Sequence, residues 1–280
     1  MRRRRLGWRP KDLFYEVSDF IKGNRVLFRG TTMFGRTRIL EGRIDGEHMR
    51  LLEVQRSEQS ASYLGERWCE LPFAYMRRFD CIFEAPHKVS RILLLGGGAM
   101  AYPRHIIANH EGVSIDVVEI DPKIIDLAHE YFFLDRLESR YHAQSSGRLT
   151  IHCDDAGQYL KEAQLAQVRY DAIINDCYQA MLSAGSPFTD ESLEAIRACL
   201  EPGGLYVLNA VGSLSGEDLN IARMVGLLSP HFPYICALPT KPHQNLSKYG
   251  NICVVACDEP IALSDAIPLM GELGTHFQSL

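Results

Sequence analysis

Arg91-Ile-Leu-Leu-Leu-Gly-Gly-Gly98 is a short apolar run that stops at three glycines. A run of this kind is typical of a strand buried on both faces of a parallel sheet. Glycines directly after such a strand let the backbone turn sharply and approach a ligand that side chains would block. Pro103 follows near the start of an expected helix, a position that proline prefers. The stretch therefore predicts the first strand, turn and helix of an α/β domain.

Strands and helices alternate from this stretch to near the end of the chain. Further strands are expected at 114–119, 149–152, 170–175, 205–209, 234–238 and 252–257, and helices at 103–110, 122–131, 156–163 and 190–200. Apolar strands that alternate with amphipathic helices predict a parallel sheet covered on both faces. The expected fold class is therefore α/β, with a doubly wound, Rossmann-like domain over residues 86–280.

The chain before this domain has a different pattern. Short alternating runs occur at 26–28, 37–40, 41–44 and 48–54, and Asp45-Gly46 joins the last two. Asp-Gly between such runs is a strong β-hairpin signal. A helix is expected at 66–83, where apolar residues recur at roughly helical spacing. Residues 1–85 thus predict a small β-rich, hairpin-containing module followed by a linking helix.

Composition excludes several classes of protein, since the 280 residues are 46% hydrophobic and 23% charged. No apolar run approaches the length of a membrane span. The net charge of −5 includes four arginines at 2–5, so the rest of the chain is acidic and nucleic-acid binding is not expected. Trp8-Arg-Pro-Lys-Asp12 follows the basic start where a secretory signal would be apolar, which predicts a cytoplasmic protein. The cysteines form no C-x-x-C pair and the histidines no H-x-x-x-H or H-E-x-x-H motif, so no metal site is expected.

Glycines or polar side chains stand at the ends of four successive strands of the expected sheet. In chain order they are Gly96, Gly97, Gly98, Glu119, Asp154, Asp155, Asn175 and Asp176. The carboxyl ends of parallel strands meet at one edge of a sheet, so these groups outline one crevice. Glu119 closes the second strand downstream of the glycine turn, where a carboxylate accepts hydrogen bonds from both ribose hydroxyls. A nucleoside site is therefore expected.

The sequence around Glu119 narrows the choice of nucleoside. Glu119-Ile-Asp121-Pro122 followed by a helix favours an S-adenosylmethionine site over a nicotinamide one. The acid pair Asp154-Asp155 after the third strand, where adenine would lie, favours the same choice. We therefore expect a sheet of the S-adenosylmethionine methyltransferase type, with Asp121 in the binding set. The expected ligand is S-adenosylmethionine, its decarboxylated form or methylthioadenosine.

At these residues the chain resembles the spermidine synthase (aminopropyltransferase) family. The matching stretches are Arg91–Gly98, Val117-Val-Glu-Ile-Asp-Pro122, Asp155-Ala156, Tyr170-Asp-Ala-Ile-Ile-Asn-Asp176, and, in the β-rich module, Met49-Arg-Leu-Leu52 and Glu58-Gln59-Ser60. The resemblance covers about residues 35–257 and implies a transferase of polyamine biosynthesis. It also implies that the glycine turn, Glu119, Asp155 and Gln59 hold the nucleoside. Family members usually pair through their β modules, which implies a homodimer.

The chain departs from the family where the amine binds. Family members transfer an aminopropyl group to an amine such as putrescine. Free alkylamines have a pKa near 10, so acids must hold the diammonium substrate and accept a proton. The acid that follows the glycines in the family is Ala99 here, and Gln179 stands where the family has its base. A Tyr-His-Glu cluster of the linking helix is replaced by Ala74-Tyr75-Met76. Glutamine accepts a hydrogen bond but takes up no proton at neutral pH.

Three functions stay open at this point. The first is an aminopropyltransferase-like enzyme with an unidentified amine acceptor, in which Asp176 and Tyr178, with Gln179, form the catalytic set. The second is an S-adenosylmethionine-dependent methyltransferase, because Asn175-Asp-Cys-Tyr178 resembles the (D/N)-P-P-Y loop of amine methylases without its prolines. The third is a non-catalytic nucleoside-binding or scaffold protein. The absence of the family's base favours the non-catalytic protein, whereas the retention of Glu119, Asp155 and Asp176 favours either enzyme.

Overall fold

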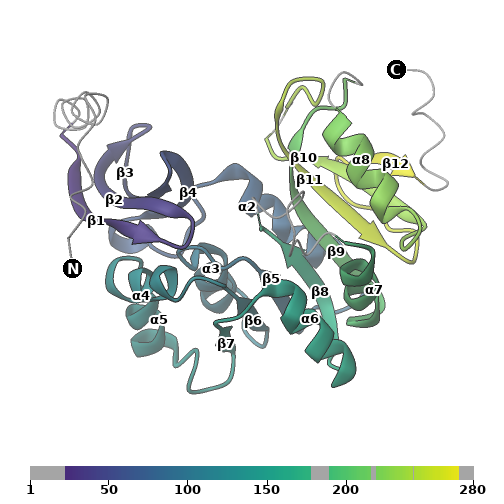
Figure 1. Ribbon diagram of the computed structural model, residues 1–280, viewed down its shortest axis with the longest axis horizontal. Helices are drawn as coiled ribbons and strands as arrows, with labels where there is room; N and C mark the ends of the chain where they lie inside the picture. Colours follow the sequence, from purple (N-terminus) through teal and green to yellow (C-terminus); the bar gives the residue numbers. More distant parts are fainter. Residues whose placement is uncertain (1–22, 178–188, 216–218, 242, 271–280) are drawn as a thin grey trace, which may run out of the picture.

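Two sheets organise the part of the chain that the structure describes. The computed structural model describes residues 23–177, 189–215, 219–241 and 243–270. A four-stranded sheet has the order β1-β2-β3-β4, and an eight-stranded sheet has the order β12-β10-β11-β9-β8-β5-β6-β7. Figure 1 shows the four-stranded sheet in purple at one side of the molecule, with strands β9–β12, in green and yellow, at the other. No helix among these residues is long and apolar enough to cross a membrane.

The N-terminal sheet is a series of antiparallel hairpins. Its strands are β1 (Arg25–Thr32), β2 (Gly35–Ile44), β3 (Glu47–Val54) and β4 (Ser57–Tyr63). Asp45 and Gly46, with φ of 49° and 83°, form the turn between β2 and β3. Two positive φ values are what a tight hairpin turn of type I′ requires. The hairpin expected there is confirmed, and β4 is a strand with no counterpart in the sequence analysis.

The prediction of a helix at 66–83 is wrong. Three short helices occupy this segment, namely η1 (Gly65–Arg67), α2 (Ala74–Arg78) and η2 (Phe79–Glu84). Pro72 interrupts the segment, because proline lacks an N–H donor and disfavours helical geometry in the residue before it. Phe73 is extended, with φ −80° and ψ 129°, so the helical turns of α2 begin only after it.

The large sheet is mixed rather than wholly parallel, which corrects the sequence expectation. Strands β5 (Arg91–Leu95), β6 (Ser114–Val118), β7 (Leu149–His152), β8 (Tyr170–Asn175) and β9 (Leu200–Gly212) run parallel. Strand β11 (Gly250–Cys257) pairs antiparallel with both β9 and β10 (Tyr234–Pro239), and β12 (Ile267–Met270) is antiparallel to β10. No described helix separates β10 from β11. A connection without a crossover suits antiparallel pairing.

Helices cover both faces of this sheet, so the doubly wound α/β class is confirmed. They are α3 (Ala101–Asn109), α4 (Pro122–Tyr131), α5 (Leu134–Tyr141), α6 (Ala156–Leu165), α7 (Asp190–Ala198) and α8 (Leu219–Leu228). Ile92 and Leu94 point into a core with α3 and α5, whereas Leu93 and Leu95 point into a core with α6, α7 and α8. This division follows from the alternation of side chains along a strand.

The N-terminal sheet packs against the edge of the large sheet where the glycines lie. Ile39 of β2 and Leu52 of β3 form an apolar cluster with Ile124 and Leu127 of α4. Ala99, which directly follows the glycines, is buried in the same cluster. This contact places one face of the N-terminal sheet over the carboxyl ends of the parallel strands. The domain boundary between residues 85 and 86 stays a prediction.

Candidate active site

A cavity of about 1180 Å³ lies between the N-terminal sheet and the large sheet. Its walls come from β3, β4 and α2, from the loops after β5, β6, β7 and β8, and from β9 and β11. The loops after parallel strands are where open α/β sheets bind ligands, because neighbouring loops diverge there and leave a crevice. The crevice expected from the sequence is therefore present, and the N-terminal sheet closes one side of it.

Glu119 and the glycine turn form one end of the cavity. The N–H groups of Gly97 and Gly98 donate to Glu119 Oε2 at 3.1 Å and 2.9 Å, and the Asp121 N–H donates to Oε1 at 3.0 Å. Burial raises the pKa of Glu119, which is 7% exposed, and these three N–H groups oppose the rise. A carboxylate has about four lone-pair sites, so Glu119 retains acceptor capacity for a ligand.

Gly96 brings the loop after β8 against the glycine turn. Its φ is +90°, and a Cβ at this position would lie 3.0 Å from the carbonyl carbon and oxygen of Asp176. The Asp176 N–H in turn donates to the Leu95 carbonyl at 2.8 Å. A side chain at position 96 would therefore be strained by its φ and would push the two strand ends apart.

Asp154, Asp155 and Gln59 lie in the wall near this end. The Asp155 side chain accepts from the Gln158 N–H at 3.0 Å and so caps α6, and the Asp155 N–H donates to Asp154 Oδ1 at 2.7 Å. Gln59 reaches the wall from β4. The structure thus brings together the glycines, Glu119, Asp154, Asp155 and Gln59, all of which line the cavity.

Asp121 has other partners. Its carboxylate accepts from the Lys123 N–H at 2.9 Å, capping α4, and from the Met33 N–H at 2.6 Å, in the turn between β1 and β2. It is 1% exposed and is not among the described residues that line the cavity. Its part in ligand binding stays a prediction. In the structure Asp121 ties the N-terminal sheet to the start of α4.

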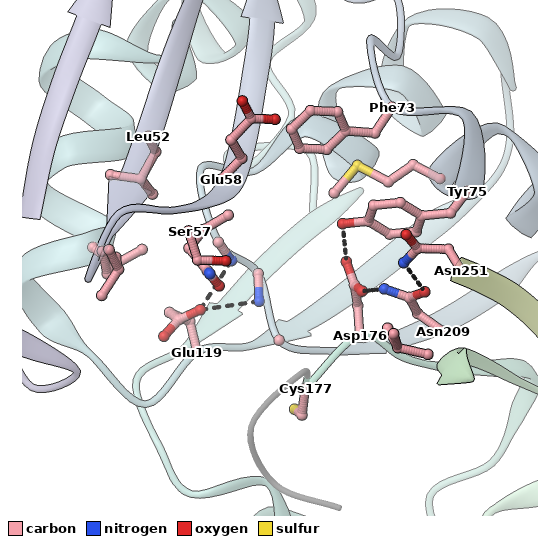
Figure 2. A pocket seen from close by; sticks show the side chains of 18 of the residues that line it. Leu52, Ser57, Glu58, Phe73, Tyr75, Glu119, Asp176, Cys177, Asn209 and Asn251 are labelled. Carbon is pink, nitrogen blue, oxygen red and sulfur yellow. Dashed lines mark hydrogen bonds between the residues drawn. The ribbon is translucent and has the colours of Figure 1, made fainter. Parts of the chain in front are cut away.

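Asp176 forms the other end of the cavity, at the tip of β8. Its Oδ2 accepts from the Tyr75 hydroxyl at 3.2 Å, and its Oδ1 accepts from the Asn209 amide at 2.8 Å. The Asn251 amide donates to Asn209 Oδ1 at 2.9 Å, which fixes the orientation of the Asn209 amide group (Figure 2). Burial raises the pKa of Asp176 to about 7, and the hydrogen bonds from Asn209 and Tyr75 oppose the rise. A carboxyl group of this kind changes charge near neutral pH.

Three residues around Asp176 were missed by the sequence analysis. Asn209 is a polar residue near the carboxyl end of an apolar strand. The same position relative to a strand led to the prediction of Asp176, so Asn209 could have been predicted in the same way. Tyr75 was considered only as part of Ala74-Tyr75-Met76, which replaces the Tyr-His-Glu cluster of the family, and no role was predicted for it. Asn251 carries no such signal, because only the antiparallel direction of β11 brings its first residues to this edge. Tyr178 and Gln179 lie outside the described residues.

The cavity wall carries more negative than positive groups. Among its described residues are six carboxylates and three cationic side chains. The cationic side chains are Arg56, Arg77 and Lys241. The Arg77 guanidinium donates to the carbonyls of Leu71 and Pro72, which turns part of its charge toward the backbone. A cleft lined mainly by one sign of charge concentrates ligands of the opposite sign, so this wall suits a cation.

The fold places the chain among α/β proteins whose sheet is similar to that of S-adenosylmethionine methyltransferases. The model of the spermine/spermidine synthase domain matches residues 81–257, and the chain belongs to this family. The resemblance found in the sequence is thereby confirmed.

Two curated relatives show how much of the chain is similar. The polyamine aminopropyltransferase of Vibrio vulnificus is 27% identical over 164 residues, covering 59% of this chain and 49% of that one. The enzyme of the same name from Shigella sonnei is 29% identical over 209 residues, covering 74% and 62%. The chain thus spans about half to two thirds of the length of these relatives.

Solved structures show the same fold. A probable spermidine synthase from Corynebacterium glutamicum superposes with a TM-score of 0.66 at 23% identity, covering 85% of this chain and 82% of that one. A spermidine synthase in complex with the transition state analogue AdoDATO gives 0.59 at 18% identity, covering 84% and 74%. Human methyltransferase-like protein 13 in complex with SAH gives 0.54 at 19% identity, covering 68% and 84%.

Proposed function

We propose that the chain transfers the aminopropyl group of decarboxylated S-adenosylmethionine to a small amine. The observation that carries this proposal is the hydrogen-bonded Asp176 carboxyl group in a cavity whose carboxylates outnumber its cationic groups. The donor carries a sulfonium and an ammonium, and the acceptor amine is a third cation in water. Intact S-adenosylmethionine adds a carboxylate, which this wall disfavours by like-charge repulsion.

The donor would occupy the end formed by the glycine turn. The cradle suits a nucleoside, because Gly96 and Gly98 adopt positive φ and Glu119, which accepts three N–H groups, keeps about one lone-pair site for a ligand. Glu119 would accept a hydrogen bond from a ribose hydroxyl. Asp154 and Asp155 would lie toward the adenine, and Gln59 would contribute from the N-terminal sheet. Membership of the family supports this assignment, which follows the positions that the family motifs occupy.

Asp176 would hold the attacking amine at the other end. The ionised Asp176 carboxylate, or water, would first take a proton from the bound ammonium, and the freed lone pair then forms the new C–N bond while the bond from that carbon to sulfur breaks. The electron pair goes to sulfur, and methylthioadenosine leaves as a neutral thioether. The new secondary amine keeps its charge as an ammonium, and the proton taken from the acceptor passes to water. Gln179 accepts no proton, so Asp176 is the acid–base group that we assign to the acceptor end.

Calorimetric titration separates the donor candidates. Wild type, Glu119→Gln and Asp176→Asn would each be titrated with decarboxylated S-adenosylmethionine, the intact form and methylthioadenosine. We expect wild type to bind the decarboxylated form more tightly than the intact one. Glu119→Gln should weaken binding by about tenfold or more, since hydrogen bonds to a charged group are lost. Asp176→Asn is the matched control and should leave methylthioadenosine affinity unchanged.

Turnover then tests the reaction. Release of methylthioadenosine would be followed with a panel of mono-, di- and triamines, and Asp176→Asn should reduce the rate by about 100-fold or more. If the protein prefers intact S-adenosylmethionine and transfers its methyl group, the proposal is wrong and the protein is a methyltransferase. Donor binding without turnover on any amine would favour a non-catalytic nucleoside-binding protein. Absence of donor binding would favour a scaffold protein. Cytoplasmic location and a homodimer stay predictions.

A further inference from the structure

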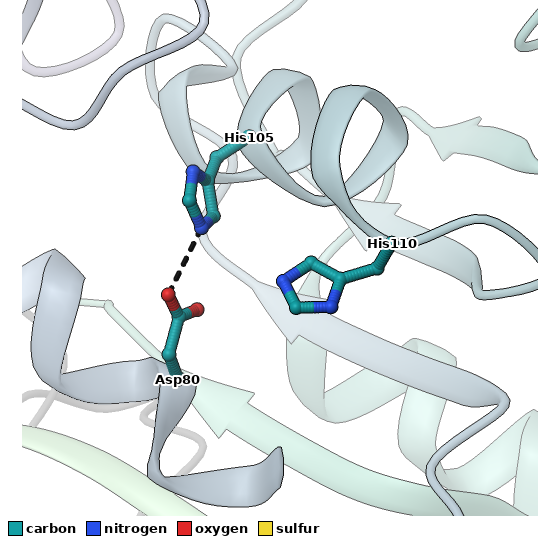
Figure 3. A group of neighbouring side chains, drawn as sticks. All are labelled: Asp80, His105 and His110. Carbon is teal, nitrogen blue, oxygen red and sulfur yellow. Dashed lines mark hydrogen bonds and ion pairs between the residues drawn. The ribbon is translucent and has the colours of Figure 1, made fainter.

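Asp80, His105 and His110 form a cluster outside the cavity. Asp80 lies on η2, His105 on α3, and His110 is the residue that ends α3. One ligand atom from each lies within 4.8 Å of the other two, and His105 Nε2 is 2.9 Å from Asp80 Oδ2. Figure 3 shows the His105 ring pointing at the Asp80 carboxylate, with the His110 ring beside them. All three side chains are partly exposed.

Each member of the cluster is held by a neighbour. The Tyr102 hydroxyl donates to Asp80 Oδ1 at 3.1 Å, which leaves Oδ2 directed at His105. The Asn109 amide nitrogen donates to the His105 carbonyl at 2.9 Å and lies 3.1 Å from His105 Nδ1, the ring nitrogen that faces away from Asp80. The His110 ring stacks on Phe83, with ring centroids 3.9 Å apart and an interplanar angle of 7°. A hydrogen bond such as the one from Tyr102 orients a carboxylate ligand in protein metal sites.

We propose that Asp80, His105 and His110 bind a divalent transition-metal ion of the zinc type. Two imidazoles and one carboxylate are a donor set that zinc and its neighbours accept, with water in the remaining position. Ligand atoms about 2.0–2.1 Å from a tetrahedral ion are about 3.3 Å apart. The His105–Asp80 separation of 2.9 Å is close to this value, and the His110 ligand atom lies within 4.8 Å of both. Partial exposure gives the ion and its water access.

The cluster has no sequence motif, and the sequence alone therefore predicts no metal site here. His105 and His110 are five residues apart, a spacing that does not place two side chains one above the other on a regular helix. His110 has left the helix, with φ −123° and ψ 85°, and its N–H still bonds the Ile106 carbonyl. The third ligand comes from 25 residues earlier in the chain. Only the packing of η2 on α3 brings the three together.

The position of the site indicates a supporting role. The ion would join η2 to α3, and η2 directly continues α2, which carries Tyr75. Phe79, the first residue of η2, packs edge-on against Tyr75, with centroids 5.7 Å apart, and against Tyr102, with centroids 5.5 Å apart. A metal ion here would therefore fasten the segment that presents Tyr75 to Asp176. The site would act by holding this segment.

Metal titration of the full chain tests the proposal. Chelator-treated protein would be titrated with Co²⁺, followed by visible absorption, and then with competing Zn²⁺. Asp80→Asn and His110→Gln remove a ligand while keeping similar shapes. His129→Gln is the matched control, because His129 pairs with Asp135 at 2.6 Å on an exposed surface. We expect one ion per chain, affinity reduced by about 100-fold or more in the two ligand variants, and no change in His129→Gln.

Thermal unfolding gives a second readout. At a free Zn²⁺ concentration about 100-fold above Kd, the Tm of the wild type should rise by about 5 °C. Asp80→Asn should show no rise, whatever its Tm in chelator. If Asp80→Asn does not fold, Tyr102→Phe keeps all three ligands and should weaken Zn²⁺ binding by about tenfold. Equal Zn²⁺ affinity in wild type, Asp80→Asn and His110→Gln, or no saturable binding, would overturn the proposal and leave a hydrogen-bonded packing contact.

Discussion

The charge of Asp176 is set by two opposing effects. Burial at the tip of β8 disfavours the ionised form, whereas donors from Asn209 and Tyr75 favour it. The balance leaves the pKa of this carboxyl at about 7, above the usual value of 3.8. Near neutral pH the group is therefore available both to accept a proton and to attract an ammonium.

This raised pKa makes a prediction about stability. Because the folded-state pKa lies above the unfolded one, the stability contributed by the neutral form is complete below about pH 4 and is lost as pH rises to about 7. Asp176→Asn removes the titration. The difference in unfolding free energy, variant minus wild type, should therefore increase by roughly 2 kcal/mol from pH 5 to pH 8. This value is reduced to account for the partial exposure of the carboxyl group. Urea unfolding at the two pH values measures it, and a constant difference would contradict it.

Tyr75→Phe should change the pH dependence of the proposed reaction. The lost hydroxyl no longer stabilises the ionised Asp176, so the pKa of this carboxyl should rise further. The acid limb of the rate profile, where activity falls as Asp176 becomes protonated, should move to higher pH. The measurement is kcat/KM for methylthioadenosine release between pH 5.5 and 9. Tyr249→Phe, which alters an exposed tyrosine, is the control, and superimposable profiles for Tyr75→Phe and wild type would refute the assignment.

Among the elements, those with a clear periodicity could be predicted and those set by tertiary contacts could not. The buried strand before the glycines, the helix that begins at Pro122 and the hairpin at Asp45-Gly46 all carry local signals. The break at Pro72 was missed because apolar spacing continues across it. The insertion of β11 between β9 and β10 was missed because pairing direction depends on the connection and not on the strand residues.

The same distinction holds for the site. Glu119, Asp155 and Asp176 could be placed because they end or follow strands whose order is regular. Asn251 could not, since its place depends on the direction of β11. Asp121 shares the local signal of Glu119, but its carboxylate is taken by Lys123 and Met33 backbone groups. Sequence position indicates which strand end a residue occupies, whereas the partners of its side chain depend on packing.

The loop after β5 gives a prediction with an internal control. Gly96→Ala and Gly112→Ala both place a side chain at positive φ, +90° and +83°, but only position 96 has protein backbone at 3.0 Å. Gly112→Ala should lose about 1 kcal/mol of stability from backbone strain alone. Gly96→Ala should lose a further 1–3 kcal/mol, roughly, from overpacking against Asp176. Chemical denaturation of both variants measures the difference, and equal losses would mean that the contact has no energetic role.

At the scale of the whole molecule, the cavity depends on two sheets staying together. The N-terminal sheet contributes Leu52, Glu58 and Gln59 to the wall, and it is held by the apolar cluster around Ile39 and by the bond from Met33 to Asp121. Arg50 adds a hydrogen bond to the Tyr131 carbonyl at the end of α4. Loosening this contact should therefore weaken ligand binding as well as stability.

Ile39→Ala tests this coupling. Ile39 is fully buried between the sheets and does not line the cavity, so its truncation should cost about 2–4 kcal/mol through the void it leaves. It should also reduce methylthioadenosine affinity several-fold. Ile235→Ala, at a buried residue of β10, is the matched control and should cost similar stability with unchanged affinity. Calorimetry and denaturation on both variants make the comparison, and equal affinities would argue against a role for the N-terminal sheet in closing the site.

The two ends of the cavity are built by different parts of the chain. Glu119 and its partners come from β5, β6 and the loops beside them, whereas Tyr75, Asn209 and Asn251 come from α2, β9 and β11. A substitution at Tyr75 or Asn251 thus leaves every hydrogen bond of Glu119 in place. Under the proposed function, one copy of such a chain could acquire a new acceptor after gene duplication by a few substitutions at one end, while it inherits the donor end unchanged.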